Sequence, residues 1–490
     1  MNKKLLFRHV LFVALLIGLS SCGTTDTVTV VQNGPQTVTP GDTAAADTDE
    51  EFQAITVGLI DPVENFDPLF ADNLSTMRVL SLIYDGLFTL DQTGDVVPAI
   101  ADEVSVSDDG LEYRIQIKSN LFFHDGSAFQ SGIGRQLQAS DIKWAFERTA
   151  QAGVPSTASK LLTNIEGYNN YAKEQRELFE DRKQILDEVS GIIVEDPQTI
   201  VFVLMEPDDN FTRKLASPYL YIYPQEAVQT SGENLSMEPV GTGSYMFREK
   251  TDSGSMTLSL DTSEHSEARI EQPQVDRVDF VGGTPERTLF QQFARGDIHW
   301  IPEIGPQISL QVTDGDGNLQ STYDDLYGVT QTGAERTNYF YFHESGETNV
   351  LWLKDRLYNV DLSSIDLHAT FEMTEEPENL EITSEPDSSY LVTYTDDIYA
   401  RSLLSTLQND FMDSDISLSL FEIRVPTNQT AMYTLNGDSF HDSLFDVESN
   451  FWVKMSSPIT SLYLPAVTGI EENEVPWKLF MESVRVPEQD

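Results

Sequence analysis

The chain has 490 residues and a formal net charge of −50 at pH 7, with 80 acidic and 30 basic side chains. A surface this acidic argues against nucleic acid or an anionic membrane as a partner. The acidic residues are spread along the chain, which favours a solvated shell suited to high salt over a site that recruits cationic ligands. A chain of this length can build its core across two or three domains.

The first 22 residues have the pattern of a secretory signal. Basic residues at positions 3, 4 and 8 precede an apolar run, 11–19, that is too short to span a bilayer. The sequence Leu19-Ser20-Ser21-Cys22 resembles the lipobox of bacterial lipoproteins, in which the signal is removed before a cysteine that carries a diacylglycerol. Cys22 is the only cysteine, so a lipidated chain would contain no disulfide. The alternative is an ordinary secreted protein with a chance cysteine.

The segment after Cys22 predicts a flexible tether. Residues 23–50 contain eight threonines and neither lysine nor arginine, and they have no helical or strand periodicity. A coil of this length spans on the order of 30 Å. Gly23 is not the aspartate that retains many lipoproteins on an inner membrane. We therefore expect a cell-envelope protein held on the periplasmic side or at the cell surface.

From about residue 55 onwards, alternating strand and helix patterns predict a mixed α/β fold class. The expected strands are Glu112–Ile117, Ile192–Val194, Thr199–Leu204 and Tyr245–Phe247, the second and third forming a hairpin around Asp196-Pro197. Ser140 is placed to cap a helix that contains Ile142 and Phe146. Lys173–Glu188 predicts a charged helix whose buried stripe is Leu178, Phe179, Ile185 and Leu186.

Several motifs occur in an order that resembles one family. They are Asn65–Pro68, Leu82–Phe88, Val97–Ala101, Ser107–Tyr113, Phe122–Gly126, Ala139–Arg148, Pro239–Tyr245, Val275–Phe280 and Phe293–Ile298. This set is similar to the bacterial extracellular solute-binding proteins of family 5, the peptide- and nickel-binding subunits of ABC importers. In the stretch Glu238–Phe247, Gly241 and Gly243 match a turn of that family. They lack the spacing of a phosphate-binding loop, which favours a tight backbone turn.

The resemblance implies a class II, periplasmic-binding-protein-like fold of two α/β lobes with a ligand cleft between them. The expected parts are a signal peptide (1–21), a lipidated cysteine and tether (22–50), a first lobe (51–304), a shortened second lobe (305–465) and a segment that returns to the first lobe (466–490). The implied function is the capture of a peptide or similar small solute by hinge closure and its delivery to ABC permease subunits. The implied protein is a monomer without a cofactor.

The second lobe departs from the family pattern. Thr337–His343 resembles a family strand, and Leu444–Val447 with Phe451-Trp452 resembles a later segment. Peptide-binding members have an aspartate shortly after that tryptophan, which pairs with the α-amino group of the ligand. This chain has Lys454 nearby instead, either as a surface lysine or as a partner for a carboxylate. The candidate ligand-binding residues are Gly241, Thr242, Gly243, Tyr245, Tyr339, Asp446, Trp452 and Lys454.

Two other functions are alternatives to import. The sequence has neither H-E-x-x-H nor G-x-S-x-G, and its histidines have no metal-ligand spacing, so we expect no catalytic residue and no metal site. A nickel- or haem-carrying role is possible within the family, but no histidine pattern singles it out. The shortened second lobe and the missing aspartate leave open a lipoprotein that keeps the fold as a sensor, scavenger or scaffold.

Overall fold

The computed structural model describes residues 53–177, 185–229, 234–314, 316–342 and 453–486, with the short segments 370–373, 389–395, 408, 417–423 and 432–438. Residues 51–490 form one unit of the chain and residues 1–50 another. Within the described segments, no helix combines the length and the apolar character needed to cross a membrane.

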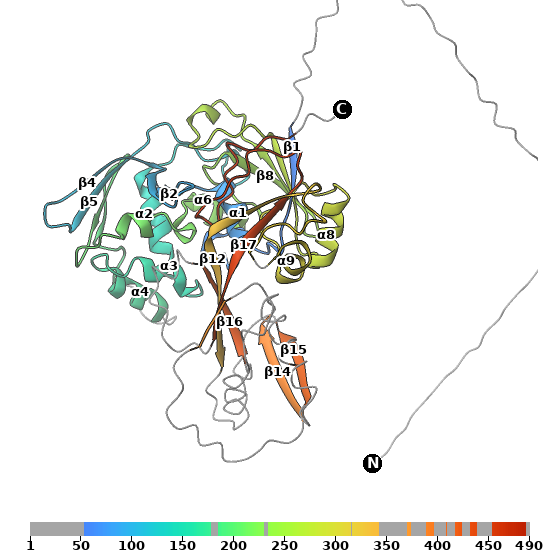
Figure 1. The fold of residues 1–490 in the computed structure, drawn as a ribbon. Coiled ribbons are helices and arrows are strands. Elements are labelled where there is room, and N and C mark those ends of the chain that lie inside the picture. The colour runs from blue at the N-terminus through green and yellow to red at the C-terminus, as the bar shows by residue number, and fades with distance from the viewer. Residues whose placement is uncertain are drawn as a thin grey trace, which may run out of the picture. The chain divides into compact units, whose positions relative to one another are not determined.

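The largest sheet among the described residues has nine strands (Figure 1). Its order is β16-β12-β17-β11-β1-β10-β9-β8, with β13 also paired to β17. The strands are β1 (Ala54–Gly58), β8 (Tyr245–Lys250), β9 (Met256–Leu260), β10 (Arg277–Val281), β11 (Trp300–Ile301), β12 (Gly328–Phe342), β13 (Thr370–Met373), β16 (Met432–Asp438) and β17 (Val453–Tyr463). Only β1 pairs in parallel, with β10 on one side and β11 on the other. Its Ile55 and Val57 are fully buried between these neighbours.

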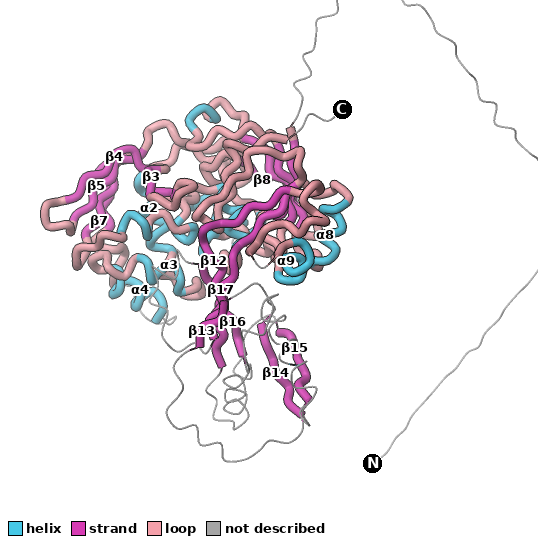
Figure 2. The backbone as a smooth tube through the Cα atoms, viewed as in Figure 1, coloured by secondary structure: helices cyan, strands magenta, loops and turns pink. Residues whose placement is uncertain are grey.

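The long strands β12 and β17 run side by side over most of their length (Figure 2). Near one end β17 pairs with β11, and beyond an irregularity between Gln331 and Glu335 the partners of β12 include β16. The two strands therefore connect the sheet around β1 with β13 and β16. The expected strand Thr337–His343 is confirmed as part of β12, up to Phe342.

A second sheet has the order β4-β5-β7-β6 and is antiparallel throughout. It consists of β4 (Ala101–Val106), β5 (Glu112–Ile117), β6 (Ile192–Asp196) and β7 (Thr199–Val203). Alternate residues of β5 are buried, as the alternating sequence predicts. The expected hairpin of β6 and β7 is also confirmed. Two further pairs are β2 (Phe88–Leu90) with β3 (Val96–Pro98), and β14 (Ser389–Thr395) with β15 (Ser417–Ile423).

The helices pack mainly around the first part of the chain. They are α1 (Leu74–Ile83), α2 (Ala139–Arg148), α3 (Ser156–Leu161), α4 (Tyr168–Glu177), α5 (Phe211–Lys214), α6 (Gln225–Gln229), α7 (Asn234–Met237), α8 (Glu286–Ala294) and α9 (Pro306–Val312), with short 3₁₀ turns at Pro68–Phe70, Pro218–Leu220 and Ser266–Ala268. α2 lies against β6 and β7, and α1 is buried on every side. A polar side chain on such a buried helix, such as Arg78, needs a partner, because burying an unpaired charge is costly.

Two helix predictions need correction. α2 begins two residues earlier than a cap at Ser140 requires: Gln138 is its cap residue, and its N–H donates to the Asp141 carboxylate at 2.9 Å. A carboxylate at the third helical position can therefore satisfy a backbone donor at the helix start, which the sequence reading overlooked. The helix expected up to Glu188 is α4, which ends at Glu177, and Ile185 is 82% exposed instead of buried. Leu178 and Phe179 lie outside the described residues.

The core is continuous from β1 to the end of the described chain. Val467, Trp477, Leu479 and Met481 belong to the same buried cluster as α1. A neighbouring cluster joins Leu289 and Phe293 of α8 to Ile308 and Val312 of α9. This packing extends past residue 304, where the sequence placed the end of the first lobe.

Candidate ligand-binding site

The turn at Gly241–Gly243 lies directly against the end of α1. A Cβ atom on Gly241 would lie 2.0 Å from the Ile83 carbonyl oxygen, and one on Gly243 would lie 2.4 Å from that of Leu82. Both distances are shorter than any real carbon–oxygen contact, so only glycine fits at either position. The Gly243 N–H donates to the Ile83 carbonyl at 2.9 Å and closes the contact.

His124 contacts the same turn through both its ring and its backbone. Its Nε2 lies 2.7 Å from the Gly243 carbonyl oxygen, so this nitrogen carries the proton and donates. Its Nδ1 accepts from the Gly241 N–H at 3.4 Å, and its backbone N–H donates to the Gly241 carbonyl at 2.8 Å. Burial, reinforced by the Arg269 guanidinium, lowers the pKa of His124 to about 3. The imidazole is therefore neutral at pH 7.

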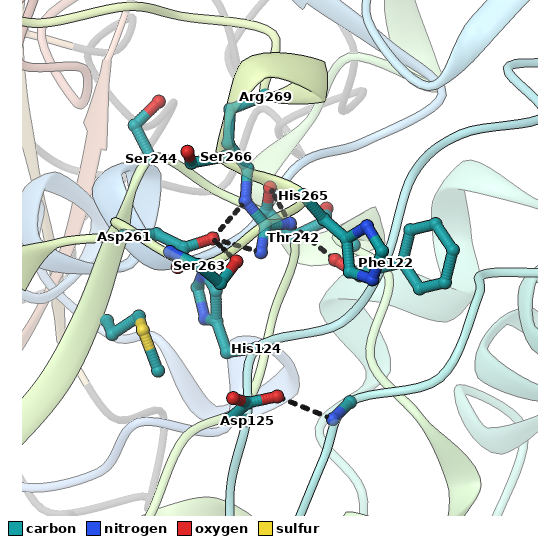
Figure 3. Close-up of polar contacts among 12 residues, drawn as sticks. Phe122, His124, Asp125, Thr242, Ser244, Asp261, Ser263, His265, Ser266 and Arg269 are labelled. Carbon is teal, nitrogen blue, oxygen red and sulfur yellow. Dashed lines mark hydrogen bonds and ion pairs between the residues drawn. The ribbon is translucent and has the colours of Figure 1, made fainter.

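Arg269 supplies the positive charge beside this turn. Its guanidinium lies between the Asp261 carboxylate and the backbone of residue 242 (Figure 3). It donates to Asp261 through Nε at 2.7 Å and to the Thr242 carbonyl at 3.1 Å, and it also contacts the Phe122 carbonyl. These bonds and those of His124 occupy most backbone polar groups of the turn. The turn consequently has a structural role, and Thr242 is fully buried within it.

Thr242 connects the turn to Asp85, which follows α1. The Thr242 hydroxyl donates to the Asp85 carboxylate at 2.8 Å. Asp85 in turn lines a small cavity of about 10 Å³, room for about one water molecule. We call it the Asp85 pocket; its lining residues are Ser81, Tyr84, Asp85, Gly86, Thr89, Tyr221, Ile270, Glu271 and Lys478.

The charged groups of the Asp85 pocket are unevenly matched. The Lys478 ammonium forms an ion pair with Glu271 at 2.8 Å and donates to the Thr89 hydroxyl at 2.9 Å. Burial raises the pKa of Asp85 to about 6. The Thr242 hydrogen bond and the charges of Arg269 and Lys478 lower this pKa, and the Glu271 carboxylate raises it, but burial has the largest effect. Burial and the same two carboxylates also raise the pKa of Tyr221.

A second cavity of about 20 Å³ also has Lys478 in its wall. We call it the Arg78 pocket; among its lining residues are Arg78, Trp300, Thr330, Thr332, Ser461 and Lys478. Arg78 pairs with Glu303 at 2.7 Å, with both side chains almost completely buried, and its Nε donates to the Pro476 carbonyl at 2.9 Å. Trp300 Nε1 donates to the Ser461 hydroxyl at 2.7 Å. This pocket is therefore bordered by β12 and β17, the strands that leave the β1 sheet.

The structure separates the residues expected from sequence into three groups. Tyr245 is fully buried, and its hydroxyl donates to the Val275 carbonyl at 2.8 Å, a core position like that of Thr242. Tyr339 and Lys454 are brought together as directly paired residues of β12 and β17. Asp446 and Trp452, like Cys22, lie outside the described residues.

Sequence reasoning did not select Asp85, Tyr221, Glu271 or Lys478 as site residues. Asp85 lies within the Leu82–Phe88 motif, so the sequence marks its position. The sequence does not show which charged groups surround it in the folded chain. Glu271 and Lys478 belong to no motif and are adjacent only in the folded chain. The described residues contain no group of three His, Cys, Asp or Glu side chains that could hold a metal ion. The chemistry available at the Asp85 pocket is hydrogen bonding and charge pairing.

Two sequence relatives share part of this chain. Glutathione-binding protein GsiB of Salmonella typhi is 28% identical over 181 residues, which are 37% of this chain and 29% of that protein. Di/tripeptide-binding protein 4 of Pseudomonas aeruginosa is 31% identical over 163 residues, 32% of this chain and 27% of that protein. The chain thus matches less than a third of the length of these relatives.

Two solved structures share the fold over much more of the chain. The murein tripeptide binding protein MppA of Escherichia coli has a TM-score of 0.67 at 13% identity, covering 89% of this chain and 99% of that one. OppA of Haemophilus influenzae, solved with the peptide RPPGFSPFR, has a TM-score of 0.65 at 12% identity, with the same coverage. The fold is therefore mixed α/β and resembles these two-lobed periplasmic binding proteins, as the sequence predicted.

The match to a family model covers the turn at Gly241–Gly243 and three residues of the Asp85 pocket, Tyr221, Ile270 and Glu271. The model of the bacterial extracellular solute-binding proteins, family 5 (middle), matches residues 95–357, more than half of the chain. With the fold, the ordered motifs and this match all in agreement, the chain belongs to the bacterial extracellular solute-binding proteins of family 5.

Proposed function

We propose that this chain is the solute-capturing subunit of an ABC importer, which binds a peptide or similar small solute and delivers it to a membrane permease. The observation that carries this proposal is the family match across residues 95–357 on a fold shared with peptide-binding proteins. Closure about connecting strands such as β12 and β17 would enclose the solute, because a ligand that contacts both lobes stabilises the closed state.

We further propose that the protein is anchored to the cell envelope by lipid on Cys22. The support is the single cysteine at the end of an apolar signal, followed by a threonine-rich segment. The test is metabolic labelling with a fatty acid in cells that express the chain or its Cys22→Ala variant. Label and membrane association should be present in the first and lost in the second. Equal membrane association of both would contradict the anchor.

Ligand capture can be measured as a shift in thermal unfolding. The purified protein is heated in high salt with and without pooled peptides of two to six residues. A ligand at 100 times its dissociation constant adds about 2.7 kcal/mol to the free energy of unfolding, which is about 3 °C for a folded part of this size. A shift with one pool, traced to single peptides by calorimetry, would support capture.

Absence of any shift with the peptide pools would contradict peptide capture. The sensor, scavenger or scaffold role expected as the alternative would then be favoured. A pull-down from membranes that contain the importer's permease separates the two roles further. The importer subunit should retain the permease only when its solute is present, whereas a scaffold would bind partners regardless of solute.

A further inference from the structure

The strands β12 and β17 change their register at one place. The last pair before the change is Gln331 with Thr460, and the next is Glu335 with Pro458. Residues 332–334 of β12, which we call the β12 bulge, therefore lie opposite a single residue of β17. A bulge leaves backbone groups out of the ladder and bends its strand, and Pro458 has no N–H to donate to the ladder. Bending of the two strands therefore breaks the fewest ladder bonds here.

Up to the β12 bulge, the strands are fixed to the first part of the chain. The Ile304 N–H donates to the Thr460 carbonyl at 2.9 Å, and the Leu464 N–H donates to the His299 carbonyl at 2.9 Å. Beyond the bulge, β12 pairs with β16 and β17, and β17 also pairs with β13. A movement of these outer strands against the β1 sheet must therefore bend β12 at or near the bulge.

A segment that follows β17 lies against the β12 bulge. The Gly333 N–H donates to the Asn473 carbonyl at 3.0 Å. The Glu474 carboxylate lies beside the same glycine: a Cβ on Gly333 would be 1.9 Å from Glu474 Oε1. No side chain fits at position 333 while Glu474 keeps this place. We call residues 473–475 the strap, because they bind the bulge although they belong to no strand of the sheet.

The strap is itself held by the first part of the chain. The Glu474 N–H donates to the carbonyl of Gln92, in the loop between β2 and β3, at 2.8 Å. Val475 is 1% exposed in the core cluster that contains α1, and its N–H donates to Asn473 Oδ1 at 3.0 Å. The strap therefore cannot follow the outer part of β12, and a change in the bend of β12 acts directly on the bond between Gly333 and Asn473.

A cavity beside this contact allows the bend to change. The Arg78 pocket, about 20 Å³, has Thr332 of the bulge and Asn473 and Val475 of the strap in its wall. It has room for about one water molecule. Because close-packed atoms resist displacement, a cavity at the bulge permits a small backbone shift.

The geometry points to the strap as a conformational restraint on the connecting strands. Its bond to the β12 bulge stabilises one bend of β12 over others, so the segment after β17 sets how readily the two parts of the sheet move. For its effect on capture, this inference rests on the proposed function. A solute that is enclosed at one bend only is bound with the help of the strap or against it, and its dissociation constant changes accordingly.

The restraint can be measured without a solute. The full chain with Cys22→Ala contains no other cysteine, so spin labels can be placed on Asp102→Cys of β4 and Ser417→Cys of β15. Electron spin resonance then gives the distribution of distances between the two labels. This distribution reports the bend of β12, because β4 belongs to the first part of the chain and β15 lies with β14 and β16 beyond the bulge.

Two variants release the strap from opposite sides. Asn473→Ala removes the Oδ1 that holds the Val475 N–H, and Gly333→Pro removes the N–H that binds the strap. Proline is tolerated at bulges, where no ladder bond is lost. Each variant should raise the fraction of molecules at other bends about fivefold, the effect of one lost hydrogen bond. Should Gly333→Pro fail to fold, Asn473→Ala decides, since its side chain is only half-buried.

Asn169→Ala is the matched control. It removes a side-chain hydrogen bond of 2.9 Å from α4 to the Thr163 carbonyl and should leave the label distances unchanged. Unchanged distances in the strap variants would overturn the proposal. Changed distances in Asn169→Ala as well would show a general loosening of the chain and would also overturn it.

Calorimetry then connects the strap to capture. A peptide that shifts unfolding is titrated into the parent chain, the two strap variants and Asn169→Ala. Both strap variants should change its dissociation constant about fivefold in the same direction, and Asn169→Ala should leave it unchanged. Tighter binding would show that the strap opposes closure and weaker binding that it assists closure, and either supports the restraint.

Equal dissociation constants in all four chains would overturn the effect of the strap on capture. Altered label distances without any peptide binding would support the strap and contradict peptide capture. The failure of the restraint and the failure of the proposed function are therefore distinct.

Discussion

The glycine pair at 241 and 243 shows how one missing methyl group can determine a local fold. Gly243 contacts the Leu82 and Ile83 carbonyls so closely that a Cβ would overlap the backbone of α1. We expect Gly243→Ala to lower the free energy of unfolding by about 3 kcal/mol, because neither backbone can move without breaking hydrogen bonds. The measurement is urea unfolding.

Gly282→Ala is the matched control for this substitution. A Cβ at Gly282 would have its nearest neighbour at 3.5 Å, an ordinary contact, and the residue does not have a positive φ. This variant should unfold within about 0.5 kcal/mol of the parent chain. Equal stability of the two alanine variants would mean that the turn does not need its glycines.

His124 makes the stability of the protein depend on pH in acid. The pKa of its imidazole is lowered to about 3 in the folded chain, against about 6.5 when exposed in the unfolded chain. Below pH 6.5 the unfolded state therefore binds a proton that the folded state does not bind. The folded state loses about 1.4 kcal/mol per pH unit from this residue as the pH falls towards 3. The contribution is fully present above pH 6.5.

The test compares the parent chain with His124→Gln between pH 7 and pH 4.5. Glutamine can still donate to the Gly243 carbonyl, but it does not titrate. The slope of the unfolding free energy against pH should be shallower in the variant by about 1.4 kcal/mol per pH unit. His299, whose pKa burial also lowers, remains in both chains and cancels from the comparison. Identical slopes would show that His124 is protonated in the fold.

At the scale of elements, buried arginine pairs join segments that are distant in the sequence. Arg78 of α1 pairs with Glu303 after β11 and donates to the Pro476 carbonyl of the last segment. Arg78→Leu should lower the free energy of unfolding by about 3–5 kcal/mol, because it removes the cation from a buried ion pair. The double variant Arg78→Leu, Glu303→Leu should recover most of this loss. Urea unfolding of the complete double-mutant cycle is the measurement.

Arg114 of β5 and Glu195 of β6 form a suitable comparison pair at the surface. Their side chains are 45% and 37% exposed. Arg114→Leu should change stability far less than Arg78→Leu, because water and salt screen an exposed pair. Additive effects in the Arg78–Glu303 cycle would contradict an energetic link between α1 and the segment after β11.

The predictions of secondary structure are confirmed where a residue pattern depends on contacts between neighbouring parts of the chain. The alternation of β5 and the hairpin of β6 and β7 follow from which face of one sheet is buried. The helix prediction over Lys173–Glu188 was wrong at Ile185, which is exposed. Periodic apolar residues show that a helix could bury one face, but the surrounding packing decides whether that face is covered.

For the whole molecule, charge sets the conditions under which the fold is stable. At −50 the folded chain repels itself, and low salt does not screen this repulsion. The Debye length falls from about 30 Å at 0.01 M salt to about 10 Å at 0.1 M. We therefore expect the unfolding temperature to rise steeply with sodium chloride over this range. Tetramethylammonium chloride should produce the same rise, because screening does not depend on cation size. A flat or falling profile would contradict the explanation.

The sequence by itself determined the family, the mixed α/β class and the glycine turn, because each depends on residues close together in the chain. The tertiary structure alone decided the rest of the candidate site. Lys478 reaches Thr89 across 389 positions and pairs with Glu271, two residues that lie far from it in the sequence. Whether a carboxylate or a hydroxyl is satisfied depends on every group that packs around it. Burial and charge balance are therefore properties of the folded surroundings, and no single segment of sequence contains them.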